Sequence, residues 1–345
     1  MTQNLLPLYP LIFEPIYKQK IWGGKNLQSI GKTIPQNTQT PIGESWEIAD
    51  LVAFQIAGQE TDARSVIANG HLKGKTLNQV IQKYGEKCLG RLKLDPTGQF
   101  PILIKYLDAA QNLSLQVHPS KAYAKKNPDA FLKSEAWFIV AAKPGACIYK
   151  GVKQGVTPQA FKNAIANNTV EELMIKVPVK AGDCHYLPSG TCHALGKGIL
   201  VAEVQTPSDT TFRVYDWGRT SRQLHIDQAL QCIDFAPPQV SENEKKTHIA
   251  GIFTTVSRLV QCEHFRIEKV RMSQGFSQEI PYDHLVIWMV LQGKGLLITG
   301  KNKVPFKQGD TVLIPANSHD TAVQLDADTV WLEIAFPQSL TPQIG

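Results

Sequence analysis

Two copies of one short pattern constrain this chain more than any other feature of its sequence. The first copy, GDCHYLP at 182–188, is followed by His193, and the second, GDTVLIP at 309–315, is followed by His319. Each copy indicates a tight turn, a strand that ends at proline, and then a histidine. A single match would carry little weight, because Gly-Asp turns are common, but two copies predict two related β-barrels.

Short apolar runs separated by Gly, Pro and Asp fill much of the sequence and predict a mainly β fold. Two segments have helical periodicity instead, near 76–92 and 157–175, and they predict a small helical insertion. A proline-rich and then charged stretch, 237–246, divides the chain into 1–236 and 237–345. The clearest strand-like runs are 101–107, 137–142, 199–204, 287–291, 296–299, 311–315 and 330–335.

Composition excludes several classes of function for this chain of 345 residues. Its 43% apolar and 19% charged residues are typical of a globular protein. The net charge of +6 comes from scattered Lys and Arg without interleaved aromatics, so we expect no nucleic-acid partner. The six cysteines form no CxxC pair, which favours reduced thiols. We find no targeting segment and no apolar run long enough to span a membrane, and we predict a cytoplasmic monomer or weak dimer.

The candidate chemistry begins at residues 113–119. If this run is a strand, its side chains alternate, and Ser114, Gln116 and His118 share one face. Glu135 opens the next strand-like run, and a buried carboxylate is costly unless it is paired or bound to metal. Together with His193, these residues suit a divalent ion that keeps positions open for substrate. Inward-facing residues of neighbouring strands can meet at the axis of a small barrel.

Other interpretations of these residues remain open. Gln116 and His118 can be ordinary strand residues with satisfied hydrogen bonds. A structural zinc site could use Cys184, His185, Cys192 and His193, although the spacing places adjacent residues on opposite faces. His118, Glu135 and His193 also match the two-histidine, one-carboxylate set of an iron(II) oxygenase.

A third block, 198–219, carries charged residues within strand-like sequence. Glu203 and Gln205 alternate with apolar residues, so they face one side of a strand, and Arg213 follows Glu203 by ten residues. Surface strands with a salt bridge are the simpler interpretation. Beside a metal site, the same groups could move protons and hold phosphate.

Several motifs in a fixed order resemble class I mannose-6-phosphate isomerases, specifically the short bacterial form. The resemblance runs from about residue 10 to 220, and the chain departs from longer relatives at Arg219, where they carry lysine. The matching motifs are IWGG at 21–24, GESW at 43–46, Gln116-x-His118-Pro119, Lys133-x-Glu135, Gly190-Thr191-x-His193 and DTTFRVYD at 209–216.

The resemblance implies two cupin-type (jelly-roll) barrels and one Zn²⁺ per chain. Its zinc ligands would be Gln116, His118, Glu135 and His193. Lys105 and Ser114 would bind the phosphate or the substrate, and Lys133, Glu203 and Arg213 would line the reacting end. The second barrel, 237–345, holds His284 and His319 without a carboxylate at comparable spacing, so we predict that it is non-catalytic.

The implied reaction interconverts mannose 6-phosphate and fructose 6-phosphate through an enediol or enediolate. Such an isomerisation needs a Lewis acid and a positioned base. We predict Glu203 as the base, with Lys133 as its competitor, and Arg213 as the cation for phosphate or for developing charge. A cupin iron(II) oxygenase and a non-catalytic sugar-phosphate-binding protein are the alternatives.

Overall fold

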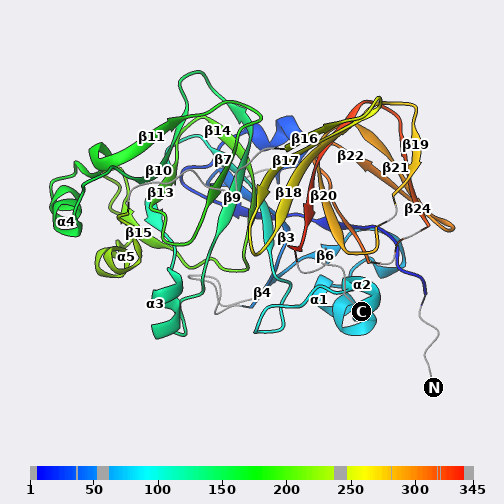
Figure 1. Ribbon diagram of the computed structural model, residues 1–345, viewed down its shortest axis with the longest axis horizontal. Helices are drawn as coiled ribbons and strands as arrows, with labels where there is room; N and C mark the ends of the chain where they lie inside the picture. Colours follow the sequence, from blue (N-terminus) through cyan, green and yellow to red (C-terminus); the bar gives the residue numbers. More distant parts are fainter. Residues whose placement is uncertain are drawn as a thin grey trace.

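The computed structural model describes residues 6–35, 38–52, 62–236, 247–280, 282–316, 318 and 320–337. The described chain is mainly β, as the sequence predicted, and Figure 1 shows two β-rich units side by side. Each unit consists of two facing antiparallel sheets, so the predicted barrels are open sandwiches. We call them the N-terminal and C-terminal units.

The N-terminal unit contains a six-stranded and a five-stranded sheet. Trp137 and Val201 of the first sheet pack against Ile148 and Leu195 of the second. The first sheet has the order β12 (Cys184–Leu187), β9 (Glu135–Ala142), β14 (Ile199–Gln205), β7 (Leu103–Ala109), β3 (Ile42–Ile48) and β2 (Ile16–Gln19). The second has the order β11 (Met174–Pro178), β10 (Cys147–Val152), β13 (His193–Leu195), β8 (Leu115–Val117) and β15 (Phe212–Tyr215).

The C-terminal unit contains an eight-stranded and a four-stranded sheet. Trp288 of the first sheet contacts Phe306 of the second across the sandwich. The first has the order β16 (Thr247–Ala250), β17 (Thr254–Gln261), β18 (Arg266–Met272), β25 (Thr329–Ala335), β20 (Val286–Gln292), β23 (Thr311–Ile314), β1 (Leu11–Glu14) and β6 (Val66–Ile67). The second has the order β19 (Ser277–Glu279), β24 (Thr321–Leu325), β21 (Lys294–Thr299) and β22 (Asn302–Lys307).

Two strands from the first seventy residues complete the sheet of the C-terminal unit. Leu11 of β1 pairs with Leu313 of β23, and Phe13 of β1 pairs with Ile67 of β6. A separate two-stranded ribbon, β4 (Asp50–Leu51) with β5 (Ala63–Arg64), follows nearby in the chain. The predicted boundary at 237–246 lies outside the described residues, and the division into 1–236 and 237–345 stays a prediction.

Alternation along the strands explains how the four sheets stack. In the six-stranded sheet, Tyr106, Phe138 and Val204 face away from the five-stranded sheet and join one core with Ile287 and Leu332 of the C-terminal unit. The neighbouring residues of the same strands face inward. One continuous apolar core therefore joins the two units, and the inner faces of the N-terminal sheets hold a second apolar cluster together with polar groups.

Both predicted helical segments contain helices, but these are shorter than the segments. Gly85 (φ 51°) separates α1 (Leu77–Tyr84) from α2 (Glu86–Leu89). Thr157 caps α4 (Pro158–Ala166), with proline in the first turn as expected, and Asn168 (φ 58°) follows its end. The other helical elements are η1 (Asn26–Ile30), η3 (Gly70–Leu72), α3 (Lys121–Lys126), η4 (Val170–Leu173) and α5 (Ile226–Cys232).

The GDxxxxP repeat forms the same structure twice. Gly182 (φ 94°) donates its N–H to the carbonyl of Ile139, and Gly309 (φ 88°) donates to that of Val290. Each aspartate side chain then accepts the N–H of the lysine three residues before it, at 2.9 Å in both copies. Because the two copies share these hydrogen bonds, equivalent positions in the two units can be compared. His319, which follows the second copy, lies outside the described residues.

Candidate metal centre and cleft

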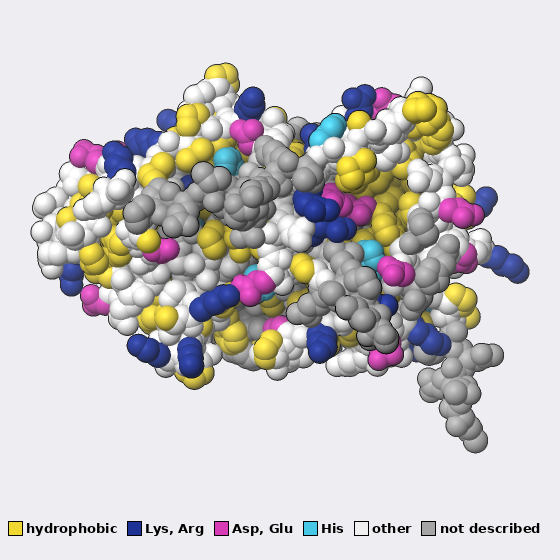
Figure 2. All heavy atoms as spheres, viewed as in Figure 1, with side chains coloured by type: hydrophobic (Ala, Val, Ile, Leu, Met, Phe, Trp, Pro, Cys, Tyr) yellow, Lys and Arg dark blue, Asp and Glu magenta, His cyan; other side chains and the backbone are white. Residues whose placement is uncertain are grey.

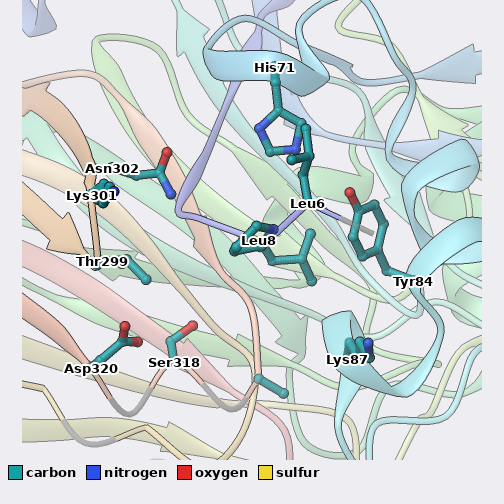
Figure 3. Close-up of a pocket in the computed structure, with 13 residues that line it drawn as sticks. Leu6, Leu8, His71, Tyr84, Lys87, Thr299, Lys301, Asn302, Ser318 and Asp320 are labelled. Carbon is teal, nitrogen blue, oxygen red and sulfur yellow. The ribbon is translucent and has the colours of Figure 1, made fainter. Parts of the chain in front are cut away.

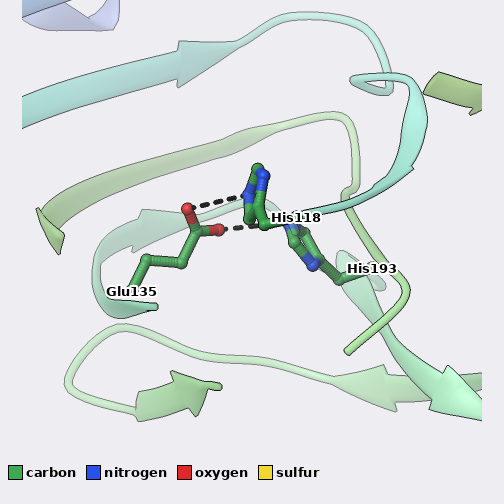
Figure 4. A group of neighbouring side chains, drawn as sticks. All are labelled: His118, Glu135 and His193. Atoms are coloured by element: carbon green, nitrogen blue, oxygen red, sulfur yellow. Dashed lines mark ion pairs between the residues drawn. The ribbon is translucent and has the colours of Figure 1, made fainter. Parts of the chain in front are cut away.

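Three buried side chains from separate strands meet inside the N-terminal unit (Figure 4). His118 follows β8, Glu135 opens β9 and His193 opens β13; each is 1% exposed. His118 Nε2 lies 3.2 Å from Glu135 Oε2, and His193 Nε2 lies 3.1 Å from Glu135 Oε1. Their potential ligand atoms all lie within 4.8 Å of one another.

The hydrogen bonds of the two imidazoles determine which atoms face the carboxylate. His118 Nδ1 lies 3.0 Å from the carbonyl oxygen of Thr210, and His193 Nδ1 lies 2.8 Å from that of Thr191. Because a carbonyl only accepts, each Nδ1 must carry a proton, and in the neutral form of each ring the lone pair of Nε2 is directed at Glu135. Converging lone pairs repel one another unless a cation lies between them. The cluster therefore fits a divalent metal ion.

The electrostatics of the cluster favour metal-binding protonation states. Burial lowers the pKa of His118 to about 3, with Lys133 adding to the effect, so the ring is neutral at pH 7. Burial by itself would raise the pKa of Glu135, but Lys133 and the two histidines hold it well below its ordinary value. His118 Nε2 and both Glu135 oxygens are buried without a hydrogen bond of acceptable geometry. Imidazole lone pairs and a carboxylate are the donors that zinc prefers.

Gln116 lies on β8 between the strand that carries His193 and the strand that carries Arg213. Its Nε2 is 3.4 Å from His193 Nε2, and Ser114 Oγ donates to its Oε1 at 3.4 Å. Rotation of the amide by half a turn would place the oxygen on the metal side. The intervening Leu115 and Val117 pack into a different core, beneath α4 and α5. The alternation predicted from the sequence is therefore present.

A second buried group lies on the inner face of the six-stranded sheet. Lys105 Nζ is 3.2 Å from Glu203 Oε1 and 3.9 Å from Glu44 Oε2, while Trp137 Nε1 donates to Glu203 Oε2 at 2.9 Å. Burial raises the pKa of Glu203, helped by Glu135 and opposed by Lys105. For Lys105 the carboxylates outweigh burial, and its pKa is raised. Glu203 is thus a carboxylate with an increased affinity for a proton.

A cleft of about 400 Å³ joins these groups to the surface. The sequence had predicted six residues of its lining: Lys105, Ser114, Gln116, Lys133, Glu203 and Arg213. Lys133 Nζ reaches inward to within 3.1 Å of Glu135 Oε2. Sequence reasoning assigned no role to the other polar residues of the lining. Some belong to motifs that carried the resemblance: Glu44, Asp209 and Thr211. The others have no recognisable spacing: Lys20, Arg222, Gln223 and His225.

The C-terminal unit differs from the N-terminal unit at the position of Glu135, the candidate carboxylate ligand. Leu187 pairs with Glu135, whereas its counterpart Ile314 pairs with Val286. Val286 therefore occupies the place of the carboxylate ligand. Two residues earlier, His284 stands in the place of Lys133.

The proton-binding carboxylate of the cleft does have a counterpart. Glu203 pairs with Trp137, and Glu333 pairs with Trp288 at the corresponding position of the second unit. Tyr282 donates a hydrogen bond to Glu333, and burial raises the pKa of this carboxyl. On the strand next to Glu203, the paired residue is Lys105. On the strand next to Glu333, however, the paired residue is Glu268. The second unit thus keeps a partly buried glutamate without its lysine.

The rival structural zinc site is not assembled. Cys184 belongs to the core between the two units, and Cys192 belongs to the core beneath α4 and α5. All six cysteines are free thiols, as predicted. Among the described residues, the candidate metal cluster contains neither cysteine.

A larger cavity of about 680 Å³ lies between the N-terminal segment, α1, α2 and the C-terminal unit (Figure 3). Its labelled residues include His71, Tyr84, Asn302 and Asp320. None of the residues predicted for chemistry lines it. On the face shown in Figure 2, the described Lys and Arg side chains lie scattered among acidic ones and form no continuous stripe. Within the described residues, no helix has the length and apolar character to cross a bilayer.

Two related antiparallel sandwiches, one with a metal-ligand cluster beneath a charged cleft, define an enzyme of the cupin class. Two family models match the chain: "Phosphomannose isomerase type I, catalytic domain" over residues 11–152, and "Mannose-6-phosphate isomerase, cupin domain" over residues 255–330. The chain therefore belongs to the type I phosphomannose isomerases, and the predicted resemblance and cupin-type fold are confirmed.

Individual relatives agree over nearly the whole chain. Mannose-6-phosphate isomerase ManA of Bacillus subtilis is 37% identical over 314 residues, which is 89% of this chain and 93% of that protein. The enzyme of Streptococcus mutans is 34% identical, over 89% of this chain and 92% of its own length. The crystal structure of mannose 6-phosphate isomerase from Bacillus subtilis superposes with a TM-score of 0.81, at 31% identity, and covers 95% of this chain and 99% of that one.

Proposed function

We propose that this enzyme is a zinc-dependent aldose-ketose isomerase that interconverts mannose 6-phosphate and fructose 6-phosphate. The observation that carries the proposal is the convergence of His118, Glu135 and His193 beneath a cleft that also holds a proton-binding glutamate and several cations. Membership of the type I family supplies the substrate pair.

The metal site takes four ligands in this proposal. His118, Glu135 and His193 bind one Zn²⁺ per chain, and Gln116 completes the set through its amide oxygen. A bound divalent ion supplies Lewis-acid polarisation of the substrate oxygens. Thr210 and Thr191 orient the two imidazoles through their carbonyl groups.

The reaction moves two protons. Removal of the proton from C2 of the aldose leaves its electron pair in a C1–C2 double bond as the C1=O1 pair moves to O1, which gives an enediolate. A proton then returns to C1, while O1 gains a proton and the hydroxyl on C2 loses one to become the ketose carbonyl. Glu203 is the proposed base, because its carboxylate is buried in the cleft wall and its pKa is raised by burial. Lys133 is the alternative carrier, 3.1 Å from a ligand carboxylate. Trp137 fixes the orientation of Glu203 through its indole N–H.

The remaining predicted residues bind the substrate. Lys105, Ser114 and Arg213 line the same cleft. Arg213 donates through Nη1 to the carbonyl of Gln223 at 2.7 Å, whereas its Nε is buried without a partner. An unpaired guanidinium N–H is suited to an anionic oxygen of the substrate or of the enediolate.

The other predicted properties complete the proposal. The second barrel, 237–345, is non-catalytic, which the valine in place of Glu135 supports. The enzyme is cytoplasmic and a monomer or weak dimer, a state that light scattering of the purified protein would measure. Its partner is a small sugar phosphate rather than a nucleic acid or a membrane.

Incubation of the purified, zinc-loaded enzyme with mannose 6-phosphate tests the proposal. We expect fructose 6-phosphate to form without consumption of oxygen. Oxygen uptake with iron(II) would instead favour a cupin oxygenase, since the same triad serves such enzymes. Binding of the sugar phosphate without any product would favour a non-catalytic sugar-phosphate-binding protein.

A further inference from the structure

The segment 216–225 follows β15 and supplies Arg222, Gln223 and His225 to the lining of the cleft, and we call this end of the cleft its mouth. Asp216 is buried at the start of this segment and accepts hydrogen bonds from two guanidinium groups, those of Arg219 and Arg222. The two arginines share one carboxylate but differ in every other contact. This difference separates their roles.

Arg219 holds the segment to the rest of the unit. Its Nη2 donates to Asp216 Oδ1 at 2.6 Å and to the carbonyl of Asn112 at 2.8 Å, and its Nη1 donates to Gln111 Oε1 at 3.3 Å. It does not belong to the cleft lining. The guanidinium of Arg219, at the position where longer relatives carry lysine, is therefore used for structure.

Arg222 belongs to the cleft lining, three residues further on. Its Nε donates to Asp216 Oδ2 at 2.9 Å, and its Nη2 donates to Asp216 Oδ1 at 2.5 Å. This bidentate pair uses one edge of the planar guanidinium and fixes its orientation, while Nη1 with its two N–H groups lies away from that edge. An arginine held in this way can bind an anion with little loss of side-chain entropy.

Charge is distributed unequally along the cleft. Each lysine of the lining has its own carboxylate: Lys20 with Glu44 at 3.0 Å, Lys105 with Glu203 and Lys133 with Glu135. Asp209, a further carboxylate of the lining, also acts on Lys20 and Lys105.

At the mouth, the guanidinium groups of Arg219 and Arg222 share the single carboxylate of Asp216, and Arg213 lines the cleft with Arg222. Burial lowers the pKa of Arg213, and Arg222 lowers it further. The mouth therefore has excess positive charge, which suits a dianion.

His225 adds a neutral donor beside the arginines. The backbone N–H of Arg213 donates to His225 Nδ1 at 3.2 Å, so the neutral ring carries its proton on Nε2. The ring lines the cleft with Arg213 and Arg222. A guanidinium pair with an adjacent N–H donor is a suitable set for phosphate oxygens.

We propose that Arg222 is the principal phosphate-binding residue of this enzyme, positioned by Asp216 and assisted by Arg213 and His225. The inference rests on the proposed function, because it takes the anion to be the 6-phosphate of the substrate. The inference places the 6-phosphate at the mouth of the cleft. Lys105, which is paired with Glu203, would then lie at the end of the substrate where the reaction takes place. Arg222 is a substrate-binding residue, and Asp216 is a positioning residue.

The test compares Arg222→Ala, Arg222→Lys and the wild type, each loaded with zinc. We expect Arg222→Ala to raise KM for mannose 6-phosphate roughly 10- to 100-fold, the range of a lost charge-assisted pair, with a smaller change in kcat. The inhibition constant of inorganic phosphate should rise in parallel, and Arg222→Lys should fall between. Arg271→Ala is the control, since this exposed arginine pairs only with an exposed aspartate, Asp328.

The outcomes separate this inference from the proposed function. If the wild type isomerises the sugar phosphate but Arg222→Ala keeps its KM and its phosphate inhibition constant, the inference is wrong. A loss of kcat alone would assign Arg222 a structural role and also refute it. If the wild type has no isomerase activity, the proposed function fails, and calorimetry with inorganic phosphate decides the anion site: weaker binding by folded Arg222→Ala or Arg222→Lys supports it, and equal binding refutes it.

Discussion

Replacement of Glu203 by glutamine separates proton transfer from every other role of the cleft. The amide has nearly the same volume, and its oxygen can still accept the N–H of Trp137, now 2.9 Å from Oε2. It cannot carry a proton at neutral pH. General acid–base catalysis contributes about 10²–10⁴ in rate, so kcat should fall by this factor, or about 3–5 kcal/mol in the barrier.

The same substitution also has a cost in stability. Lys105 loses its carboxylate partner at 3.2 Å and keeps only Glu44 at 3.9 Å. Breaking a buried ion pair typically costs about 3–5 kcal/mol, and the remaining carboxylate should reduce this loss. Thermal melting and metal content must therefore be measured on the sample used for turnover.

Glu333→Gln is the matched control. Glu333 occupies the corresponding position in the C-terminal unit, is partly buried, and has a raised pKa from burial. We expect this variant to keep wild-type kcat at a temperature where it is folded. Near full turnover by folded, metal-loaded Glu203→Gln would refute the assignment of the base and leave Lys133 as the carrier.

Three further predictions concern the metal and pH. Zinc should raise the melting temperature of the chelated wild type but not of His118→Ala, measured by differential scanning calorimetry; equal shifts would contradict the ligand assignment. Burial raises the pKa of Glu203, and Lys105 opposes this shift. We therefore expect kcat/KM to fall as the pH drops through the raised pKa of Glu203. In a pH–rate profile, Lys105→Met should move the acid limb to higher pH, because the opposing charge is removed. Burial favours the neutral form of Glu44, but Lys20 and Lys105 outweigh it and lower its pKa to about 2. Its stabilisation is therefore present above pH 4.5 and lost toward pH 2, and Glu44→Gln should destabilise by about 3 kcal/mol at pH 7 in urea unfolding, a difference that vanishes in acid.

The features of the fold that depend on short sequence patterns were predictable. Alternation along 113–118 indicated the shared face of Ser114, Gln116 and His118, and the GDxxxxP repeat indicated two related units. Helix ends were less predictable, because Gly85 and Asn168 interrupt helical periodicity with positive φ.

No local sequence pattern predicts that β1 and β6 join the sheet of the C-terminal unit. Leu11 pairs with Leu313, some three hundred residues away, and such pairing depends on tertiary packing rather than on sequence spacing.

The interior of the site was predictable, because its residues lie on or beside strands and belong to ordered motifs. The mouth was not. Arg222 and His225 lie in a loop and at its junction with α5, and only the folded chain shows that Arg222 rather than Arg219 faces the cleft. The valine at 286, which distinguishes the two units, is likewise visible only after the strands are paired.

Stepwise return of zinc to the chelated enzyme tests the central claim that one metal ion, held by His118, Glu135 and His193, is required for isomerisation. Metal content and turnover of mannose 6-phosphate are measured on each sample. We predict that activity disappears on chelation and returns in proportion to bound zinc, with saturation at one ion per chain. Full turnover by metal-free enzyme, or zinc binding that restores no activity, would contradict it.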